Sequence, residues 1–275
     1  MHLILPNLTS FSGDHVLTSL QNPWIKQLRR LQQSAERQTQ QRFLCEGTHL
    51  LQEAIATRWP IDAILFTQEW SDKNTVLMES FPPKSQQQLI SPQILNHLAT
   101  TEHPDGVIAI AKFREHSPQS EKLTLGLAVE AIQEPGNLGA LIRAAVATGA
   151  DGIWMSPECV DPFHPKVLRA SAGQWFRHST TSIALPPWIE DCRSRSIQVL
   201  AAAASGRSYW SFDLTKPTVF LLGNEGAGLS SSIVKLADEV ISIPMASGVE
   251  SLNVGTAGAL LLYEAVRQRG QKLNS

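Results

Sequence analysis

Polar side chains suited to chemistry gather in three turns of the C-terminal half. Asn137 and Arg143 lie in EPGNLGALIRAA, Glu225 lies in GNEGAGL, and Ser251 and Asn253 lie in ASGVESLNV. Each turn follows an apolar run that predicts a buried strand, and in an open α/β sheet such turns meet at one edge. We therefore expect the five side chains to share one site. An arginine there is suited to clamp an anion through two parallel hydrogen bonds.

Each turn also has a structural explanation that the sequence leaves open. Arg143 suits a surface position or a structural salt bridge as well as a site. Gly223, Gly226 and Gly228 either bring the backbone close to a ligand or only form a strand-to-helix turn. The small residues after Asn253 suit a flat ligand and a packed helix equally well. A buried Asn253 in a first helical turn needs a hydrogen-bond partner, so it is more informative than the glycines around it.

Common catalytic and metal-binding motifs are missing from the sequence. It has no GxxxxGK[ST], GxSxG or HExxH motif and no GxGxxG after the first strand, which disfavours phosphate-loop, serine-hydrolase, zinc and Rossmann chemistry. The cysteines, Cys45, Cys159 and Cys192, lack the pairing of a zinc site or a disulfide framework. His164 and His178 are either catalytic or structural. We expect no metal.

Alternating strands and helices in the C-terminal half predict the scaffold of the site. We expect an α/β domain whose parallel sheet is covered by helices on both faces. Asn137 is predicted to cap a helix that begins at Leu138, and Ser251 to cap a last helix that ends near Arg269. The expected strands are 123–132, 151–156, 196–204, 218–223 and 239–245, and the expected helices are 138–148, 165–172, 230–237 and 251–269.

A smaller α/β unit is expected before this half. It contains a helical stretch over 48–57 and strands over 61–67 and 107–113. The polar segment REHSPQSE separates two apolar strands, as a linker does. We therefore predict an N-terminal domain over 1–114, a linker over 115–122 and a C-terminal domain over 123–275.

The N-terminal region carries a cluster of basic residues on a predicted helix from Thr18 to about Gln41. Leu20, Trp24, Ile25, Leu28 and Leu31 recur at helical spacing and predict one dry face. The cluster is either a solvated face or a contact for RNA phosphates. Its members are Lys26, Arg29, Arg30, Arg37 and Arg42.

The composition fits a globular enzyme of about two domains. The chain has 275 residues, 43% of them hydrophobic, and a formal net charge of −2, which excludes a globally basic nucleic-acid coat. Its start lacks the charged flank and cleavage site of a signal peptide, and no apolar run is long enough to span a membrane. The sequence predicts a cytoplasmic protein.

At the three turns the sequence resembles the SpoU (TrmH) family of RNA ribose 2′-O-methyltransferases, in the SPOUT superfamily. The resemblance rests on EPGNLGALIRAAVATGADG, GNEGAGL and IPMASGVESLNV, which occur in the family's order. It extends loosely to FLCEGTHLLQEAI, which is similar to the family's N-terminal RNA substrate-binding domain. One departure is the run Gly255, Thr256 and Ala257, where the family commonly has Ser-Val-Ala.

This resemblance implies a trefoil-knotted C-terminal domain that binds S-adenosylmethionine and forms a homodimer whose active site uses both subunits. The implied cofactor contacts are Leu222, Gly223, Ile243, Met245, Leu252 and Asn253. The implied substrate is a ribose 2′-hydroxyl of RNA, and the two-domain layout favours ribosomal over transfer RNA. A non-catalytic RNA-binding or ribosome-assembly protein, a tRNA ribose methyltransferase and a base-nitrogen methyltransferase are the alternatives.

The implied catalytic residues are given roles by their chemistry. An arginine does not ordinarily lose its proton, so Arg143 is expected to clamp the target phosphate rather than to act as a base. Asn137 is expected to orient the ribose, and Glu225 to position Arg143 or the methionine end of the cofactor. Ser251 and Asn253 are expected to complete the pocket.

Overall fold

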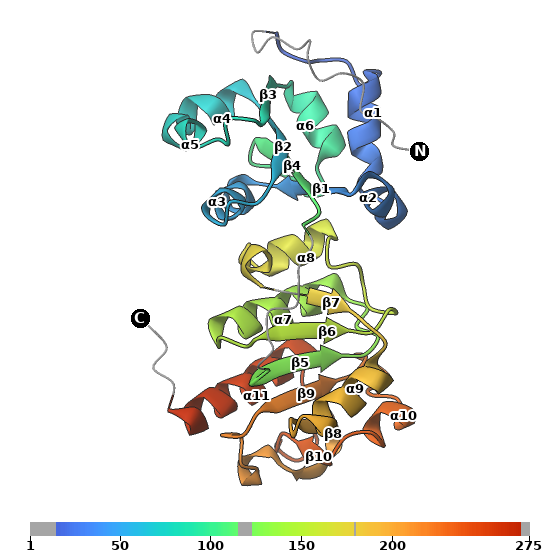
Figure 1. The fold of residues 1–275 in the computed structure, drawn as a ribbon. Helices are drawn as coiled ribbons and strands as arrows, with labels where there is room; N and C mark the ends of the chain where they lie inside the picture. The colour runs from blue at the N-terminus through green and yellow to red at the C-terminus, as the bar shows by residue number, and fades with distance from the viewer. Residues whose placement is uncertain (1–14, 115–122, 179, 271–275) are drawn as a thin grey trace. The chain divides into compact units, whose positions relative to one another are not determined.

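The structure, a computed structural model, describes residues 15–114, 123–178 and 180–270 and separates the chain into two compact units (Figure 1). Unit 1 is Met1–Glu115 together with Phe163–Pro165, and unit 2 is His116–Pro162 together with Lys166–Ser275. The predicted linker over 115–122 lies outside the described residues.

Unit 1 is a four-stranded mixed sheet with helices packed against it. The sheet order is β1-β4-β2-β3; β4 runs antiparallel to β1 and β2, and β3 runs parallel to β2. Its elements are α1 (Pro23–Arg30), α2 (Ser34–Gln40), β1 (Arg42–Glu46), α3 (Thr48–Ala56), β2 (Ile61–Phe66), α4 (Gln68–Lys73), α5 (Thr75–Glu79), β3 (Gln86–Leu89), α6 (Pro92–Leu98) and β4 (Val107–Lys112).

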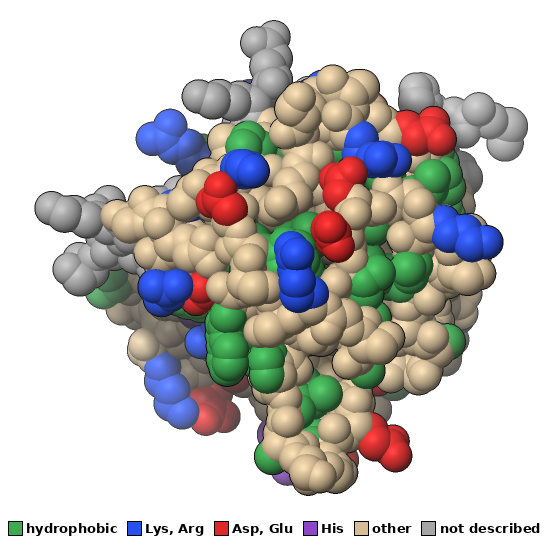
Figure 2. Space-filling view, turned by 90° about the horizontal axis from the view of Figure 1, so that it is seen from below, with side chains coloured by type: hydrophobic (Ala, Val, Ile, Leu, Met, Phe, Trp, Pro, Cys, Tyr) green, Lys and Arg blue, Asp and Glu red, His purple; other side chains and the backbone are tan. Residues whose placement is uncertain are grey.

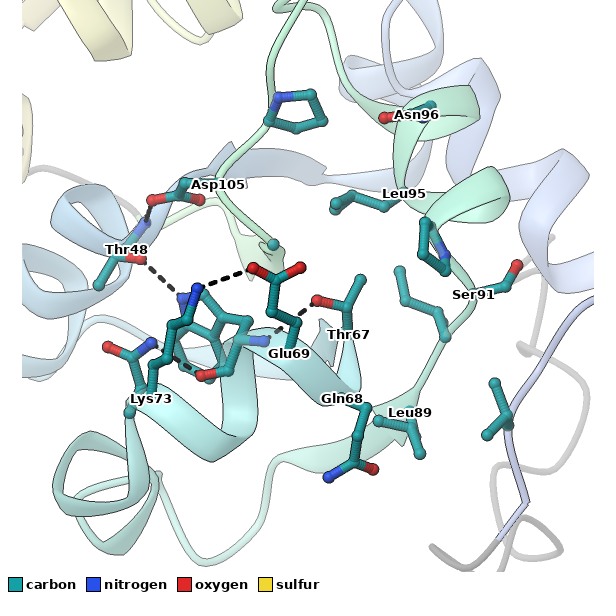
Figure 3. A pocket seen from close by; sticks show the side chains of 17 residues that line it. Thr48, Thr67, Gln68, Glu69, Lys73, Leu89, Ser91, Leu95, Asn96 and Asp105 are labelled. Atoms are coloured by element: carbon teal, nitrogen blue, oxygen red, sulfur yellow. Dashed lines mark hydrogen bonds and ion pairs between the residues drawn. The ribbon is translucent and has the colours of Figure 1, made fainter.

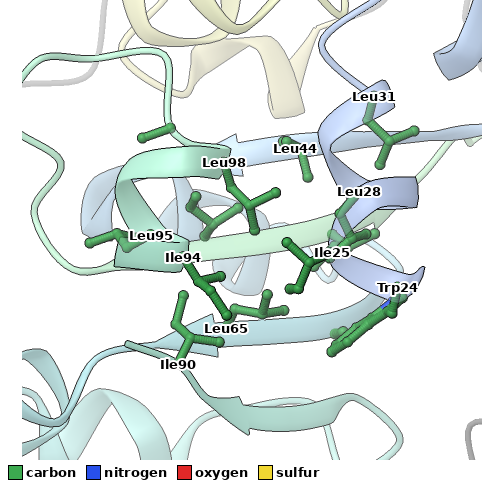
Figure 4. Packing of buried hydrophobic residues seen from close by; sticks show 14 residues of the cluster. Trp24, Ile25, Leu28, Leu31, Leu44, Leu65, Ile90, Ile94, Leu95 and Leu98 are labelled. Carbon is green, nitrogen blue, oxygen red and sulfur yellow. The ribbon is translucent and has the colours of Figure 1, made fainter. Parts of the chain in front are cut away.

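The dry face predicted for the N-terminal segment is buried in the core of unit 1. Trp24, Ile25, Leu28 and Leu31 pack with side chains of α6 and of the central strands, and Leu20 is partly buried against the same cluster (Figure 4). Because the apolar residues of α1 and α6 pack into one cluster, both helices lie on the same face of the sheet.

The single helix predicted from Thr18 to Gln41 is wrong, because the chain forms two short helices. Pro23 begins α1, where the side chain of Asn22 caps the helix, and Gln33 is extended before α2. The guanidinium of Arg37 donates to the carbonyl oxygens of Leu31 and Gln32 at 3.0 and 2.9 Å. These bonds satisfy carbonyls that the end of α1 leaves without a helical partner.

Unit 2 is a six-stranded sheet in which all paired strands are parallel. The order is β10-β8-β9-β5-β6-β7. Its elements are β5 (Leu125–Val129), α7 (Pro135–Ala147), β6 (Gly152–Met155), α8 (Pro165–Ala170), η2 (Gln174–Arg177), β7 (Thr180–Ser182), α9 (Leu185–Ser194), β8 (Gln198–Ser208), η3 (Tyr209–Ser211), β9 (Thr218–Leu222), α10 (Ser231–Val234), β10 (Glu239–Ser242) and α11 (Val254–Arg269).

Helices cover both faces of this sheet, as the sequence predicts. Leu221 packs in a cluster with α9 and α10, whereas its neighbour Leu222 faces α11 at Gly258. A Cβ at Gly258 would lie 2.3 Å from Leu141 Cδ2, so glycine is what lets α11 approach α7. The predicted fold class is confirmed. The sequence missed β7 and α9, because β7 is short and partly exposed and the first turn of α9 contains Pro186 and Pro187.

None of the helices in the described ranges is long and apolar enough to cross a membrane.

Candidate active site in unit 2

The three polar turns meet at one edge of the unit 2 sheet. The first follows β5, the second follows β9 and the third follows β10, and β5 and β9 are neighbours in the sheet. Because the strands are parallel, their carboxyl ends lie at the same edge. The shared site expected from the sequence is therefore compatible with the topology.

A chain of side-chain hydrogen bonds joins the three turns directly. Asn253 Nδ2 donates to Asn137 Oδ1 at 2.7 Å, and Asn137 Nδ2 donates to Glu225 Oε1 at 2.8 Å. The partners are 116 and 88 residues apart in the sequence. The amide of Asn137 thus has a donor on its oxygen and a carboxylate on its nitrogen, which fixes its orientation.

The first turn begins its helix earlier than predicted. Pro135 is the first residue of α7 and Glu134 is its N-cap, with a side-chain oxygen that accepts from Gly136 N. Asn137 therefore lies buried in the first turn instead of capping the helix. Proline favours the first helical position, where its missing N–H costs nothing. Lys166 forms an ion pair with Glu134.

The third turn differs from the prediction in a similar way. Asn253, not Ser251, is the N-cap of α11, which begins at Val254. Its Oδ1 accepts from Gly255 N at 2.9 Å and Thr256 N at 3.2 Å, while its Nδ2 reaches Asn137. The expectation that Asn253 is buried is wrong: it is exposed, yet both ends of its amide have partners.

Glu225 is held as a carboxylate. Partial burial raises the pKa of Glu225, but hydrogen bonds from Asn137 and from the backbone of Glu134 and Gln133 outweigh it and hold the pKa below its ordinary range. Glu225 is therefore a hydrogen-bond acceptor at neutral pH. In the described part of the chain no hydrogen bond or ion pair joins Glu225 to Arg143, the first of its two expected partners, and its role toward the methionine end of the cofactor stays a prediction.

A cleft of about 720 Å³ opens beside this chain of hydrogen bonds. All of the residues predicted to contact the cofactor line it, as do Asn137, Glu225 and Ser251. The predicted cofactor residues are Leu222, Gly223, Ile243, Met245, Leu252 and Asn253. Leu252 is 37% exposed, and Val249 nearby in sequence is 49% exposed. Such exposed apolar groups suit an apolar part of a ligand.

Arg143 lies in a second, shallower hollow of about 460 Å³ between α7 and α11. The guanidinium side chain is exposed, and Thr256 and Tyr263 line the same hollow. Asn253 lines both the hollow and the cleft. Arg143 therefore does not line the cleft itself, but it lines a hollow that shares Asn253 with the cleft.

Comparison with known proteins assigns the chain to a family. Residues 124–263 match the SpoU rRNA Methylase family, and residues 22–109 match the MRM3-like substrate binding domain. The chain belongs to the SpoU rRNA methylase family. The family predicted from the three motifs is thereby confirmed.

Relatives of this SpoU protein extend over both units. An uncharacterized tRNA/rRNA methyltransferase of Synechocystis sp. is 40% identical over 259 residues, covering 92% of this chain and 94% of the relative. A 23S rRNA (uridine(2479)-2′-O)-methyltransferase of Streptomyces viridochromogenes is 32% identical, covering 82% and 83%. The crystal structure of the SpoU methyltransferase AviRb from the same species, in complex with AdoMet, gives a TM-score of 0.82 at 30% identity, covering 90% and 98%.

Part of the SpoU cleft was not predicted from the sequence. The pairing of β10 with β8 jumps from Val240–Ala201 to Ile241–Arg207, so residues 202–206 of β8 have no partner in that ladder. Ala202, Ala203 and Ala204 from this segment line the cleft. An apolar run of alanines reads as an ordinary buried strand, and only the long-range register reveals the interruption.

The basic cluster in unit 1 is less available than its charge suggests. Arg37 is 1% exposed and serves the end of α1, which removes it from the predicted RNA surface. Arg30 pairs with Glu36, and Arg42 Nε lies 2.6 Å from Asp62 Oδ2. Arg29 donates to a backbone carbonyl. Lys26 is exposed, and its side chain makes no hydrogen bond or ion pair with other described residues.

Unit 1 has a cavity of its own, of about 560 Å³, at the carboxyl ends of β2 and β3 (Figure 3). Leu89 and Leu95 line one side, and Thr48, Glu69 and Asp105 lie on the other. Asp105 Oδ2 accepts from Thr48 N at 2.8 Å, and Glu69 pairs with Lys73. Two carboxylates against one ammonium make this cavity a poor site for RNA phosphates.

Proposed function

We propose that this protein transfers the methyl group of S-adenosylmethionine to a ribose 2′-hydroxyl of ribosomal RNA, with the cleft and hollow of unit 2 as its active site. The observation that carries the proposal is the hydrogen-bonded chain from Asn253 through Asn137 to Glu225, which ties the three motif turns together at the cleft. The family and the ribosomal RNA specificity of its Streptomyces relative support it.

The cleft fits the cofactor in size and chemistry. Its volume of about 720 Å³ lies within the range of about 300–1,000 Å³ common for small-molecule sites. Leu222, Ile243, Met245 and Leu252 offer apolar contacts, and the glycine-rich turn after β9 offers backbone donors and acceptors. A Cβ at Gly223 would lie 2.1 Å from the carbonyl carbon of Gly228, so glycine is needed for this turn to close. When bound, S-adenosylmethionine supplies an electrophilic methyl group on a sulfonium.

The residues of this chain align the acceptor. Arg143 in the adjoining hollow binds an RNA phosphate and fixes the ribose, because its fork of donors matches phosphate oxygens. An oxygen of that phosphate would take the proton of the 2′-hydroxyl as the C–S bond of the cofactor breaks and the new C–O bond forms. Asn253, which lines both cavities, and Asn137 orient the 2′-hydroxyl at the boundary between them. Glu225 positions Asn137 and stays ionised. Alignment of the two reactants provides the larger share of the rate enhancement.

A second copy of the chain completes the site. Leu260 and Tyr263 of α11 are 39% and 46% exposed, and Tyr263 lines the same hollow as Arg143. Exposed apolar residues beside the proposed acceptor site suit a homodimer in which each subunit closes its partner's hollow. Sedimentation equilibrium of the purified protein tests this proposal, and a monomer at micromolar concentration would contradict it.

Unit 1 is proposed to bind the RNA, in keeping with the substrate-binding domain that residues 22–109 match. The predicted domain roles follow: RNA binding within 1–114 and methyl transfer within 123–275. The proposal includes a knotted course of the C-terminal chain, which the family resemblance implies. It also includes a cytoplasmic location, since ribosomal RNA is modified where ribosomes are made.

Methyl transfer from labelled S-adenosylmethionine to 23S rRNA, with mass analysis of the product nucleosides, tests the function. We expect 2′-O-methylated nucleosides from the wild type and a loss of about 100-fold or more in rate for Arg143→Ala. Calorimetric binding of the cofactor without transfer would indicate a non-catalytic protein. Product on tRNA or on a base nitrogen would correct the substrate, and near wild-type transfer by Arg143→Ala would remove Arg143 from the mechanism.

A further inference from the structure

The loop from Gly223 to Ser230, here called the cofactor loop, forms much of one wall of the cleft. Side-chain hydrogen bonds fasten it to the segment between β5 and α7. Asn224 Nδ2 donates to Ala131 O at 2.9 Å, and Glu225 accepts from backbone N–H groups of Gln133 and Glu134. The start and the middle of the loop are thus held by its own side chains, which bind backbone groups of that segment.

The end of the cofactor loop at Ser230 is held by a side chain of the segment between β5 and α7, that of Glu130. Oε2 of Glu130 accepts from Ser230 N at 2.7 Å, and Oε1 accepts from Ser230 Oγ at 2.7 Å. Glu130 follows β5 directly, lies outside the cleft lining and is 100 residues from its partner. Glu130 and Glu225 therefore form a reciprocal clasp, in which each segment contributes a carboxylate to backbone N–H groups of the other.

The backbone between the two halves of the clasp is unusual. Ala131 has a φ of 53°, a left-handed conformation that is uncommon for a residue with a Cβ. Its N–H donates to Ser156 Oγ at 3.0 Å, and its carbonyl accepts from Asn224. Hydrogen bonds at both the N–H and the carbonyl of Ala131 hold this strained turn. Strained turns of this kind are typical of functional sites.

We propose that Glu130 is a positioning residue for S-adenosylmethionine, which keeps the end of the cofactor loop at Ser230 in its binding conformation. The inference rests on the proposed function of the cleft. If Glu130 is removed, the loop samples other conformations, and the ligand must order the loop when it binds. A purely structural role is the competing explanation, because Ser230 also caps the short helix α10.

The test measures cofactor binding and methyl transfer in the full-length protein. We expect Glu130→Ala to raise the Kd and KM for S-adenosylmethionine about tenfold while kcat at saturating cofactor and the KM for RNA change less than about twofold. Glu130→Gln should stay within about threefold of the wild type, because its amide can accept from Ser230 N and donate to Ser230 Oγ. Glu190→Ala, which removes an exposed carboxylate of α9, is the matched control.

Ser230→Ala gives an independent measurement. It removes one of the two bonds, so we expect an intermediate Kd, and in the double variant with Glu130→Ala the serine change should add less than it does alone. Hydrogen exchange at Gly228 and Ser230 should be faster in Glu130→Ala than in the wild type. If Glu130→Ala does not fold, the Kd and exchange rates of Ser230→Ala decide the matter.

Two results would overturn the inference. One is a Glu130→Ala protein that is less stable but binds S-adenosylmethionine as the wild type does, and the other is a Ser230→Ala protein with unchanged Kd and loop exchange. Failure of the proposed function is recognised separately, because then the wild type itself either shows no cofactor binding by calorimetry or binds the cofactor without transferring its methyl group.

Discussion

Asn253 performs two tasks that one substitution can separate. Its oxygen caps α11, and its amide nitrogen donates to Asn137. Asn253→Ser keeps a cap oxygen but removes the donor, so the free energy of unfolding should fall by less than about 1 kcal/mol. The turnover number should fall by about 10- to 100-fold, because Asn137 loses its fixed orientation. Urea unfolding and steady-state methyl transfer measure the two effects.

The control for Asn253→Ser is the same substitution at another cap. Asn22 caps α1 in unit 1, where its Oδ1 accepts from Trp24 N at 2.8 Å. Asn22→Ser should affect stability to a similar extent and leave the turnover number unchanged. Equal losses of turnover in both variants would show that the Asn253–Asn137 bond has no role in catalysis.

The ionisation of Glu225 predicts a pH dependence of stability. Hydrogen bonds hold the pKa of Glu225 in the folded protein below its unfolded value. The carboxylate therefore stabilises the fold at pH values above the ordinary Glu pKa of about 4.3. This contribution is lost as the pH falls through the folded pKa. Thermal unfolding between pH 3 and 7 should show a shallower acid decline for Glu225→Gln than for the wild type. Parallel curves for the two proteins would contradict the prediction.

At the scale of elements, sequence patterns predicted the existence of helices and strands better than their boundaries. The strands of unit 2 and the shared edge follow from apolar runs between turns, since buried parallel strands need such runs. The starts of α7 and α11 were misplaced because each has several polar residues able to cap a helix. The chain of bonds from Asn253 to Glu225 required tertiary structure, because residues 116 and 88 positions apart leave no local signal.

The break between α1 and α2 leads to a prediction about Arg37. Since Arg37 is buried and serves the carbonyls of Leu31 and Gln32, Arg37→Leu leaves these groups without their donor and should cost about 2–3 kcal/mol of unfolding free energy in unit 1. Chemical denaturation followed by tryptophan fluorescence measures this cost. A variant that is as stable as the wild type but has lost RNA affinity would instead return Arg37 to the RNA surface.

At the scale of the whole molecule, the resemblance in the motifs identified the family, because three motifs in order are specific. The sheet pattern alone predicted the class of fold, whereas the knot is proposed from the resemblance only, since strand periodicity carries no information on which loop passes through which. Composition gives the number of charges but not their distribution on the surface. On the face drawn in Figure 2, positive and negative side chains are interspersed.

A protein with a net charge of −2 must bind RNA through a few local cations, and Lys26 is the exposed, unpaired member of the basic cluster among the described residues. Lys26→Gln should therefore weaken RNA binding and reduce the slope of log Kd against log salt by about 1, as expected for the loss of one phosphate contact. Fluorescence anisotropy with an rRNA fragment at several salt concentrations measures both quantities. Lys73→Gln is the matched control, because Lys73 is paired with Glu69 at the unit 1 cavity. An unchanged slope for Lys26→Gln, with a reduced slope for Lys73→Gln, would move the RNA contact from the first helix to that cavity.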